Sequence, residues 1–522
     1  MKKRKLPIGG IQTFSELRRD YDVYVDKTQH IYDLASRYKT VFLSRPRRFG
    51  KSLLCSTIKS VFKGEKELFD GLAISKTDWQ WQEHPIIHLD LSLEDFTKSN
   101  GVETLIKSVN RQLSNICDNY GIFVEESNFI GDRFAQVIAE LSKKSNRVVV
   151  IIDEYDNPLL STITQKELND ELRCTLKGFY SVLKGSDQYL RFVFITGITK
   201  FAQITMFSGM NQPKDISMAL EHCDICGITQ EELEENFAPE INEYSKKYGG
   251  RENYLKELKD FYNGYFFTKE KTSVYNPYGI LNHFDSNAEF TPYWSLSGAP
   301  SFALKYLEEK GVNILDIEDA RMDAGGFANY KDDTISIFPL LYQAGYLTIS
   351  DYDERTSFYR LNYPNIEVRK TFAEFLANNY SQAKSILAKS ISIEFVDALV
   401  DGNVDEFMNL LKWYLHTVDY SLSSKITESY VEFAVSNIIN MLGLVCVNEA
   451  HTANGSMDSV IFTKDRIYIF EFKVDKPVEN ALRQIKRKDY ALFYARDGRK
   501  IVKVGVVFSR ESRNIVEWKT ED

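Results

Sequence analysis

The first half of the chain alternates short, almost continuous apolar runs with longer segments in which apolar residues recur at helical spacing. The runs lie at residues 40–44, 85–91, 148–152 and 192–195. Runs of this kind are typical of strands that are covered on both faces. The segments between them, such as 51–62 and 102–116, show helical spacing. The pattern predicts an α/β fold in which a parallel sheet is connected by crossover helices.

Farther along the chain the pattern changes several times. Thr229 and Glu232 open a charged helical stretch and predict a capping box, in which each side chain accepts a hydrogen bond from the other residue's backbone N–H. Aromatic and mixed segments follow, and strand alternation begins after Gly443. We therefore predict four parts: a sheet domain (1–226), a helical lid with an aromatic connector (227–300), a mixed middle region (301–390) and a C-terminal α/β domain (391–522).

Composition narrows the class of protein. The 522 residues are 43% hydrophobic and 27% charged, which is ordinary for several globular domains. No apolar run approaches the ~20 residues of a membrane span, and the basic N-terminus lacks the apolar core of a signal peptide. We expect a cytoplasmic protein without a membrane partner. The net charge of -9 argues against wrapping by nucleic acid over the whole surface, but it is compatible with a local basic channel.

The cysteines do not form a disulfide framework. The chain has six, too few and too scattered for such a framework: Cys55, Cys117, Cys174, Cys223, Cys226 and Cys446. Cys223 and Cys226 have the spacing of half a zinc site, but no second pair follows. We favour structural thiols, with a metal site as the alternative.

A phosphate-binding loop is indicated directly after the first apolar run. The octapeptide Arg45-Pro46-Arg47-Arg48-Phe49-Gly50-Lys51-Ser52 has the spacing of a Walker A loop, with Arg45 in place of its first glycine. Gly50 would let the backbone close around a phosphate, Lys51 would reach the β- and γ-phosphates of ATP, and Ser52 would bind Mg²⁺. The alternative is a basic turn that only resembles this loop.

Acidic residues follow the third apolar run, as they do in a Walker B strand. Asp153 would hold Mg²⁺, and Glu154 would activate the attacking water. Thr196 ends the next run, where a polar residue would sense the γ-phosphate. The alternative interpretation is an acidic turn without a ligand.

The arginines of the loop have two possible functions. Arg45, Arg47 and Arg48 could add positive charge to the phosphate site, or they could act on the nucleotide of a neighbouring subunit, which would require a homo-oligomer. A solvated basic loop is an equal alternative for any single one. The replacement at Arg45 bears on hydrolysis more than on nucleotide binding, because its bulk could reshape the loop.

A second candidate site lies in the predicted hairpin at residues 455–473. Strand alternation places Glu471 and Lys473 on one face, and a two-residue turn at 464–465 sets Asp458 opposite Glu471. Cross-strand partners lie ~5 Å apart, so both carboxylates could bind one Mg²⁺. Lys473 would orient or activate a water, and the set is suited to cutting phosphodiesters.

Two flanking helices supply further candidates for this site. Glu428, on a predicted upstream helix, would be a third metal ligand, and we prefer it to Glu432 one turn later. Gln484, on the helix after the hairpin, is assigned a catalytic function. A surface salt bridge is the alternative for the whole set.

Five segments together resemble one known arrangement: 24–28, 45–52, 152–156, 262–265 and 469–473. The sequence resembles the bacterial AAA-ATPase-like family with a C-terminal PD-(D/E)XK nuclease domain, over nearly the whole chain. The resemblance implies a P-loop NTPase domain at 1–226, a restriction-endonuclease-like domain at 391–522, and ATP and Mg²⁺ as cofactors. Ser456 stands where the family usually has Arg, and Glu432 where it often has His, which leaves the rate of strand cleavage open.

These observations favour an ATP-binding and ATP-hydrolysing protein whose nucleotide state controls a Mg²⁺-dependent nuclease. DNA is preferred to RNA as the substrate. The alternative is a nucleotide-dependent switch whose nuclease-like domain only binds nucleic acid. A scaffold in which both sites have decayed ranks last, because both sets keep their acidic and basic residues.

Overall fold

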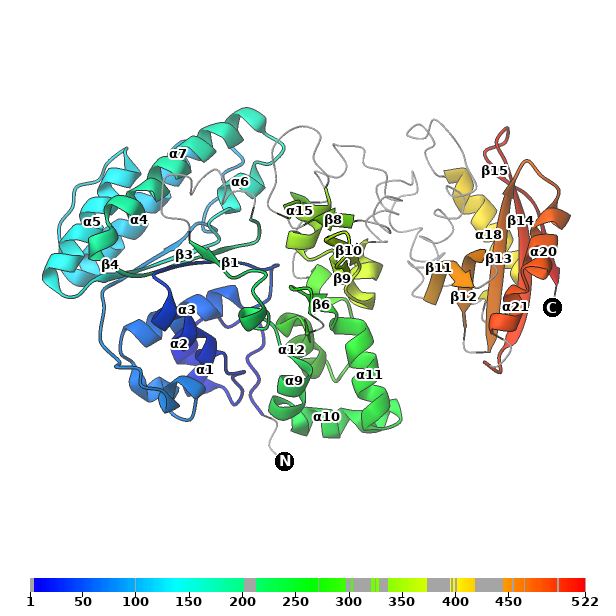
Figure 1. Cartoon of the computed structure of the whole chain (residues 1–522), viewed down its shortest axis with the longest axis horizontal. Helices are drawn as coiled ribbons and strands as arrows, with labels where there is room; N and C mark the ends of the chain where they lie inside the picture. The colour runs from blue at the N-terminus through cyan, green and yellow to red at the C-terminus, as the bar shows by residue number, and fades with distance from the viewer. Residues whose placement is uncertain are drawn as a thin grey trace. The chain divides into compact units, whose positions relative to one another are not determined.

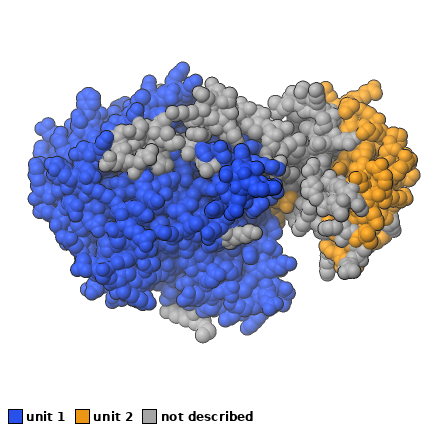
Figure 2. Space-filling model, in the orientation of Figure 1, with its two compact units in different colours: residues 1–367 blue, residues 368–522 orange. Residues whose placement is uncertain are grey.

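The computed structural model of the chain divides into two compact units, residues 1–367 and residues 368–522 (Figure 2). The structure describes residues 4–98, 100–200, 213–270, 272–296, 302–303, 321–323, 325–327, 337–372, 395, 398–399, 401–417, 445–452, 455–463, 465–494 and 497–521. Among these residues, no helix combines the length and the apolar character needed to cross a membrane.

A five-stranded parallel sheet forms the centre of the first unit. Its order is β2-β3-β4-β1-β5. The strands are β1 (Thr40–Ser44), β2 (Ile86–Asp90), β3 (Val148–Asp153), β4 (Leu190–Gly197) and β5 (Lys214–Asp215). Every residue of β3 is buried, as its continuous apolar run predicts for a strand covered on both faces.

Helices cover both faces of this sheet (Figure 1). One face carries α1 (Phe14–Asp20), α2 (Thr28–Arg37) and α3 (Lys51–Phe62), and the other carries α4 (Gly101–Tyr120), α5 (Ile130–Lys144) and α7 (Lys166–Gly185). Shorter segments are α6 (Asn157–Ser161), η1 (Lys66–Phe69), η2 (Ala73–Lys76), η3 (Asp187–Tyr189) and η5 (Leu220–His222). The predicted parallel sheet with crossover helices is confirmed.

A helical cluster follows the sheet within the same unit. It comprises α9 (Gln230–Asn236), α10 (Ala238–Tyr244), η6 (Ser245–Tyr248), α11 (Arg251–Tyr262) and α12 (Pro277–Asp285). The predicted capping box is present, because the Thr229 hydroxyl accepts from the Glu232 N–H and the Glu232 carboxylate accepts from the Thr229 N–H. Leu233, Tyr254 and Phe284 lie in its apolar core, so these helices pack together. That they act as a lid stays a prediction.

Short elements complete the first unit. They are the hairpin of β6 (Tyr265–Phe266) and β7 (Ser273–Val274), the antiparallel sheet of β8 (Arg321–Asp323), β10 (Phe358–Asn362) and β9 (Thr348–Asp353), and the helices α13 (Tyr293–Leu296) and α15 (Phe338–Ala344). The Lys200 N–H donates to the Gln343 side chain, which links α15 to the residues after β4.

The second unit is built on a mixed sheet. Its order is β11-β12-β13-β14-β15, and only β13 and β14 are parallel. The strands are β11 (Val445–Thr452), β12 (Gly455–Phe462), β13 (Arg466–Val474), β14 (Lys500–Ser509) and β15 (Asn514–Glu521), and the helices are α18 (Val404–Thr417), α20 (Val478–Arg487) and α21 (Tyr490–Phe493).

Alternation along β13 assigns its side chains to two different layers. Phe470 and Phe472 pack in the core that includes α18. Ile467 and Ile469 pack in the core that includes α20, which lies on the opposite face (Figure 1). Glu471 and Lys473 continue this second alternation, so they lie on the α20 face. The predicted C-terminal α/β fold is confirmed, whereas the finer division of the chain into four parts stays a prediction.

Candidate functional site

The loop between β1 and α3 has the conformation that an anion-binding turn requires. Gly50 adopts a φ of +91°, and a Cβ added there would meet nothing within 4 Å, so the backbone is open on that side. The first N–H groups of α3 follow directly and have no partner within the helix. Lys51 is buried, with Nζ 3.2 Å from Glu154 Oε1 and donating to the Pro46 carbonyl.

The end of β3 brings the predicted acidic pair to this loop. Asp153 is buried, and burial together with the neighbouring Glu154 charge raises the pKa of its carboxyl group, while a hydrogen bond from Ser52 opposes this shift. Ser52 and Asp153 therefore present adjacent oxygen atoms, which suit Mg²⁺. Glu154 has a φ of +49°, a left-handed conformation that is strained for a non-glycine residue and that clusters at functional sites.

A cavity of about 370 Å³ opens beside these residues, within the size range of small-molecule sites. Lys51, Ser52 and Glu154 line one side. Residues 9–12 line another, and residues 277–278 and 281–282 at α12 line a third. The phosphate loop, the N-terminal segment and the helical cluster thus all line this cavity.

The second candidate site lies on the α20 face of the second unit. The register Ser459 to Phe470, continued by one residue, sets Asp458 opposite Glu471, as predicted. Lys473 Nζ lies 2.9 Å from Glu471 Oε1, and both side chains are buried. The Phe472 N–H donates to the Asp458 carboxylate at 2.7 Å, which fixes its position. A buried lysine and two carboxylates thus share one small region.

Comparison with known proteins supports the same division. The sequence matches a predicted AAA-ATPase family over residues 7–207 and the PD-(D/E)XK nuclease superfamily over residues 426–518. A protein of Azotobacter chroococcum mcd 1, described as an uncharacterized protein in the vnfD 5' region, is 33% identical over 535 residues, covering 100% of this chain and 99% of that protein. The chain belongs to the family of predicted AAA-ATPases with a C-terminal PD-(D/E)XK domain. No solved structure shows significant similarity.

Within the AAA-ATPase domain, the three loop arginines have different surroundings. The Arg45 guanidinium is buried, donates to the carbonyls of Ser44, Ser217, His222 and Cys223, and lies 4.0 Å from the centre of the Phe267 ring. Those carbonyls lie outside the cavity lining, so the expected phosphate contact from Arg45 is not the arrangement observed.

The other two loop arginines line the cavity. Arg48 is exposed, and its guanidinium lies 4.9 Å from the centre of the Tyr278 ring on α12. Arg47 and Arg48 are therefore placed to contact a phosphate group in the cavity without any rearrangement of the apolar core. Arg48 as a phosphate ligand stays a prediction.

Thr196 lies on β4, between the strands that carry the phosphate loop and the acidic pair. Its side chain is fully buried, and among the described residues its hydroxyl has no hydrogen-bond partner. Asp156, two residues after Glu154, accepts from the N–H groups of Ile198 and Thr199. This carboxylate therefore joins the ends of β3 and β4, a role that sequence analysis did not assign.

The PD-(D/E)XK domain contains a residue that sequence analysis missed. Burial raises the pKa of Tyr490, the charge of Glu471 raises it further, and a hydrogen bond with Gln484 opposes the shift. Gln484 and Tyr490 therefore belong to the same neighbourhood as Glu471. Tyr490 opens α21, outside the helical repeat of α20, so no spacing signal marks it.

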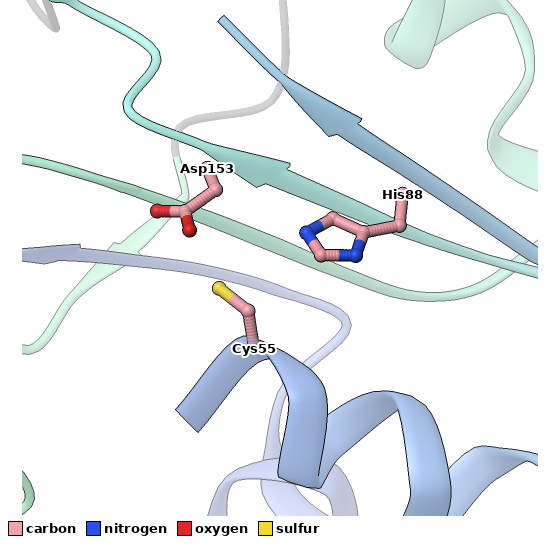
Figure 3. A group of neighbouring side chains, drawn as sticks. All are labelled: Cys55, His88 and Asp153. Carbon is pink, nitrogen blue, oxygen red and sulfur yellow. The ribbon is translucent and has the colours of Figure 1, made fainter. Parts of the chain in front are cut away.

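Glu428 and Glu432 lie outside the described residues, and so does the side chain of Ser456. Cys223 and Cys226 are buried. In the described part of the chain, a different group of side chains could hold a metal ion: Cys55, His88 and Asp153 (Figure 3).

Proposed function

We propose that this protein binds and hydrolyses ATP in its N-terminal domain, and cuts nucleic acid phosphodiesters in a Mg²⁺-dependent reaction in its C-terminal domain. The observation that carries the nuclease proposal is the buried Glu471–Lys473 pair beside Asp458. Burying a charged pair costs desolvation energy that a purely structural core would avoid with apolar residues. A site that binds a metal ion and a water requires such charged groups, which would account for their burial despite this cost.

Each residue of the C-terminal site has a distinct task in this proposal. Asp458 and Glu471 would hold Mg²⁺ through oxygen atoms, with Glu428 as a further ligand. The ion would lower the pKa of a bound water and offset charge on the phosphate. Lys473 would orient that water, and Gln484 would hydrogen-bond Tyr490 or the substrate. DNA is the substrate we propose first.

The nuclease proposal is tested by cleavage of plasmid DNA, single-stranded DNA and RNA with Mg²⁺ or Mn²⁺, with and without ATP. Lys473→Ala is expected to lower the rate at least ~100-fold, the scale of a positioned proton-transfer group. Lys519→Ala, which removes an exposed lysine from the same sheet, is the matched control and should cut at the normal rate. If the unaltered protein binds nucleic acid without cutting it, the alternative is favoured, a nucleotide-dependent switch whose nuclease-like domain only binds nucleic acid.

In the N-terminal domain, Gly50 and Lys51 would hold the phosphates, Ser52 and Asp153 would hold Mg²⁺, and Glu154 would activate water. Thr196 would face the γ-phosphate, and Arg48 would add positive charge. Arg47 or Arg48 could also serve a neighbouring subunit in a homo-oligomer, which a measurement of mass in solution with and without ATP would reveal.

Two variants distinguish the proposed binding of ATP from its proposed hydrolysis. Lys51→Ala should abolish detectable MgATP binding, because the buried ammonium that meets the phosphates is lost. Glu154→Gln should keep the affinity and lower hydrolysis at least ~100-fold. Lys63→Ala, at the exposed far end of α3, is the control. Normal hydrolysis in Glu154→Gln would remove Glu154 from the reaction.

A further inference from the structure

Three side chains of different chemistry converge between α3 and the sheet of the first unit (Figure 3). Cys55 comes from α3, His88 from β2 and Asp153 from β3. One potential ligand atom from each lies within 4.8 Å of the other two. A thiol, an imidazole and a carboxylate are thus available to a single ion.

The fold explains why these residues meet. Pairing of β2 with β3 sets His88 beside Ile151 and Asp90 beside Asp153, so His88 and Asp153 project from the same face of the sheet. The helix α3 packs over that face. Cys55 lies four residues, about one helical turn, after Lys51 and therefore directs its thiol toward the sheet. Asp153, at the end of β3, therefore belongs both to this group and to the candidate phosphate site.

The donor set indicates the class of ion. Mg²⁺ is bound by oxygen ligands, whereas sulfur and imidazole nitrogen beside a carboxylate suit zinc. Bond lengths of ~2.0–2.3 Å place neighbouring ligands of tetrahedral zinc roughly 3.3–3.8 Å apart, so side-chain shifts of about 1 Å would close the site. A water could fill the fourth position.

The histidine supplies a second observation. Among the described residues, its Nε2 atom is buried without a hydrogen-bond partner. Leaving a buried polar nitrogen without a hydrogen-bond partner is unfavourable. The His88 ring reaches toward Cys55 and Asp153 (Figure 3), so an ion held between the three would satisfy this nitrogen.

We propose that Cys55, His88 and Asp153 bind a zinc-class ion, and that this ion inhibits the ATPase by withdrawing Asp153 from Ser52 and Mg²⁺. The binding site stands on its own geometry, whereas the inhibition rests on the proposed ATP-dependent function. Binding replaces the thiol proton by the metal, and the proton passes to solvent. Coordination by a divalent ion is what makes this buried thiol ionise.

The site is tested with Co²⁺ and Zn²⁺ on the full chain, reduced and without nucleotide. Co²⁺ should give a thiolate-to-metal absorption band, and Zn²⁺ should displace it. Cys55→Ser should abolish the band and weaken Zn²⁺ binding at least about tenfold. Cys174→Ser, which changes an exposed cysteine on α7, should behave as the unaltered protein does. A band of unchanged intensity in Cys55→Ser, or no band in the unaltered protein, would overturn the site.

His88→Gln provides a second variant in case Cys55→Ser does not fold. It should keep the thiol yet weaken Zn²⁺ binding at least about tenfold, with unfolding in metal-free buffer close to normal. Unchanged Zn²⁺ affinity in a folded His88→Gln variant would also overturn the site.

The inhibition is tested separately from the site. MgATP affinity is measured without Zn²⁺, which tests the proposed nucleotide binding, and then at a Zn²⁺ concentration that saturates the site. We expect affinity to fall at least tenfold with Zn²⁺ in the unaltered protein and to change less than twofold in His88→Gln. Zn²⁺ binding without any change in MgATP affinity would retain the site and remove its inhibitory function.

Discussion

At the scale of single residues, Gly264 in the segment 262–265 lets two stretches of backbone pack closely. Its φ of +91° lies in the left-handed region, and a Cβ added there would stand 1.9 Å from the Pro364 carbonyl oxygen. The residue follows α11 and leads into β6. The chain therefore needs glycine at this position for both its conformation and its close backbone approach.

Gly264→Ala is expected to lower the free energy of unfolding of the first unit by about 2–4 kcal/mol, through left-handed strain and displacement of the 364 backbone. Chemical denaturation followed by fluorescence measures it. Gly178→Ala is the matched control, because a Cβ on that exposed glycine of α7 would meet nothing within 4 Å, and stability there should hold or rise slightly. Equal stability of the two variants would contradict the prediction.

The positions of several candidate site residues were predictable from local spacing, whereas their functions stay predictions. Lys51 opens the helix that follows β1, and Asp153 ends β3. Glu471 and Lys473 follow from alternation within β13. Arg45 and Tyr490 were not predictable in this way. The carbonyls that bind Arg45 lie as far as 178 residues along the chain, and Tyr490 meets its neighbours across a helix boundary. Contacts of this kind exist only after the chain has folded.

At the scale of elements, Arg45 joins the end of β1 to the segment from Ser217 to Cys223. Its Nη1 donates to the carbonyls of Ser44 and Ser217, and its Nη2 donates to those of His222 and Cys223. The guanidinium also lies 4.0 Å from the centre of the Phe267 ring.

Strands also differ in whether local sequence or distant pairing determines them. The apolar runs of β1 and β3 predict strands from the local sequence alone. The short β5 (Lys214–Asp215) is a strand only because it pairs with Val41 and Phe42.

Arg45→Lys keeps the charge but cannot reproduce the fork of donors. We expect it to lower the free energy of unfolding by about 2–4 kcal/mol, because hydrogen bonds from a buried charged group are lost. MgATP affinity of the folded variant should stay within about threefold, since Arg45 lies outside the cavity lining. Denaturation and calorimetric titration measure the two effects. Arg48→Lys serves as the stability control, and normal stability with lost nucleotide binding in Arg45→Lys would instead restore Arg45 as a phosphate ligand.

At the scale of the whole molecule, each candidate site is assembled from described residues of one unit. The phosphate loop, the acidic pair and the cavity belong to residues 1–367, and Asp458, Glu471 and Lys473 belong to residues 368–522. Control of cleavage by ATP therefore requires an energetic coupling between two separately built sites rather than a shared residue. Such a coupling is reciprocal in binding free energy.

Reciprocity gives the proposed control a test that does not depend on cleavage rates. In the Lys473→Ala variant, which should bind nucleic acid without cutting it, MgATP is expected to change nucleic acid affinity by a factor of about 5–150, the usual range of such couplings. Nucleic acid must then change MgATP affinity by the same factor, which calorimetric titration in both orders measures. Combining Lys473→Ala with Lys51→Ala should remove the effect of MgATP while nucleic acid still binds. If MgATP does not change the nucleic acid affinity and nucleic acid does not change the MgATP affinity, the two domains are joined in sequence but act independently. A ligand can shift an equilibrium only if it binds the two states with different affinity.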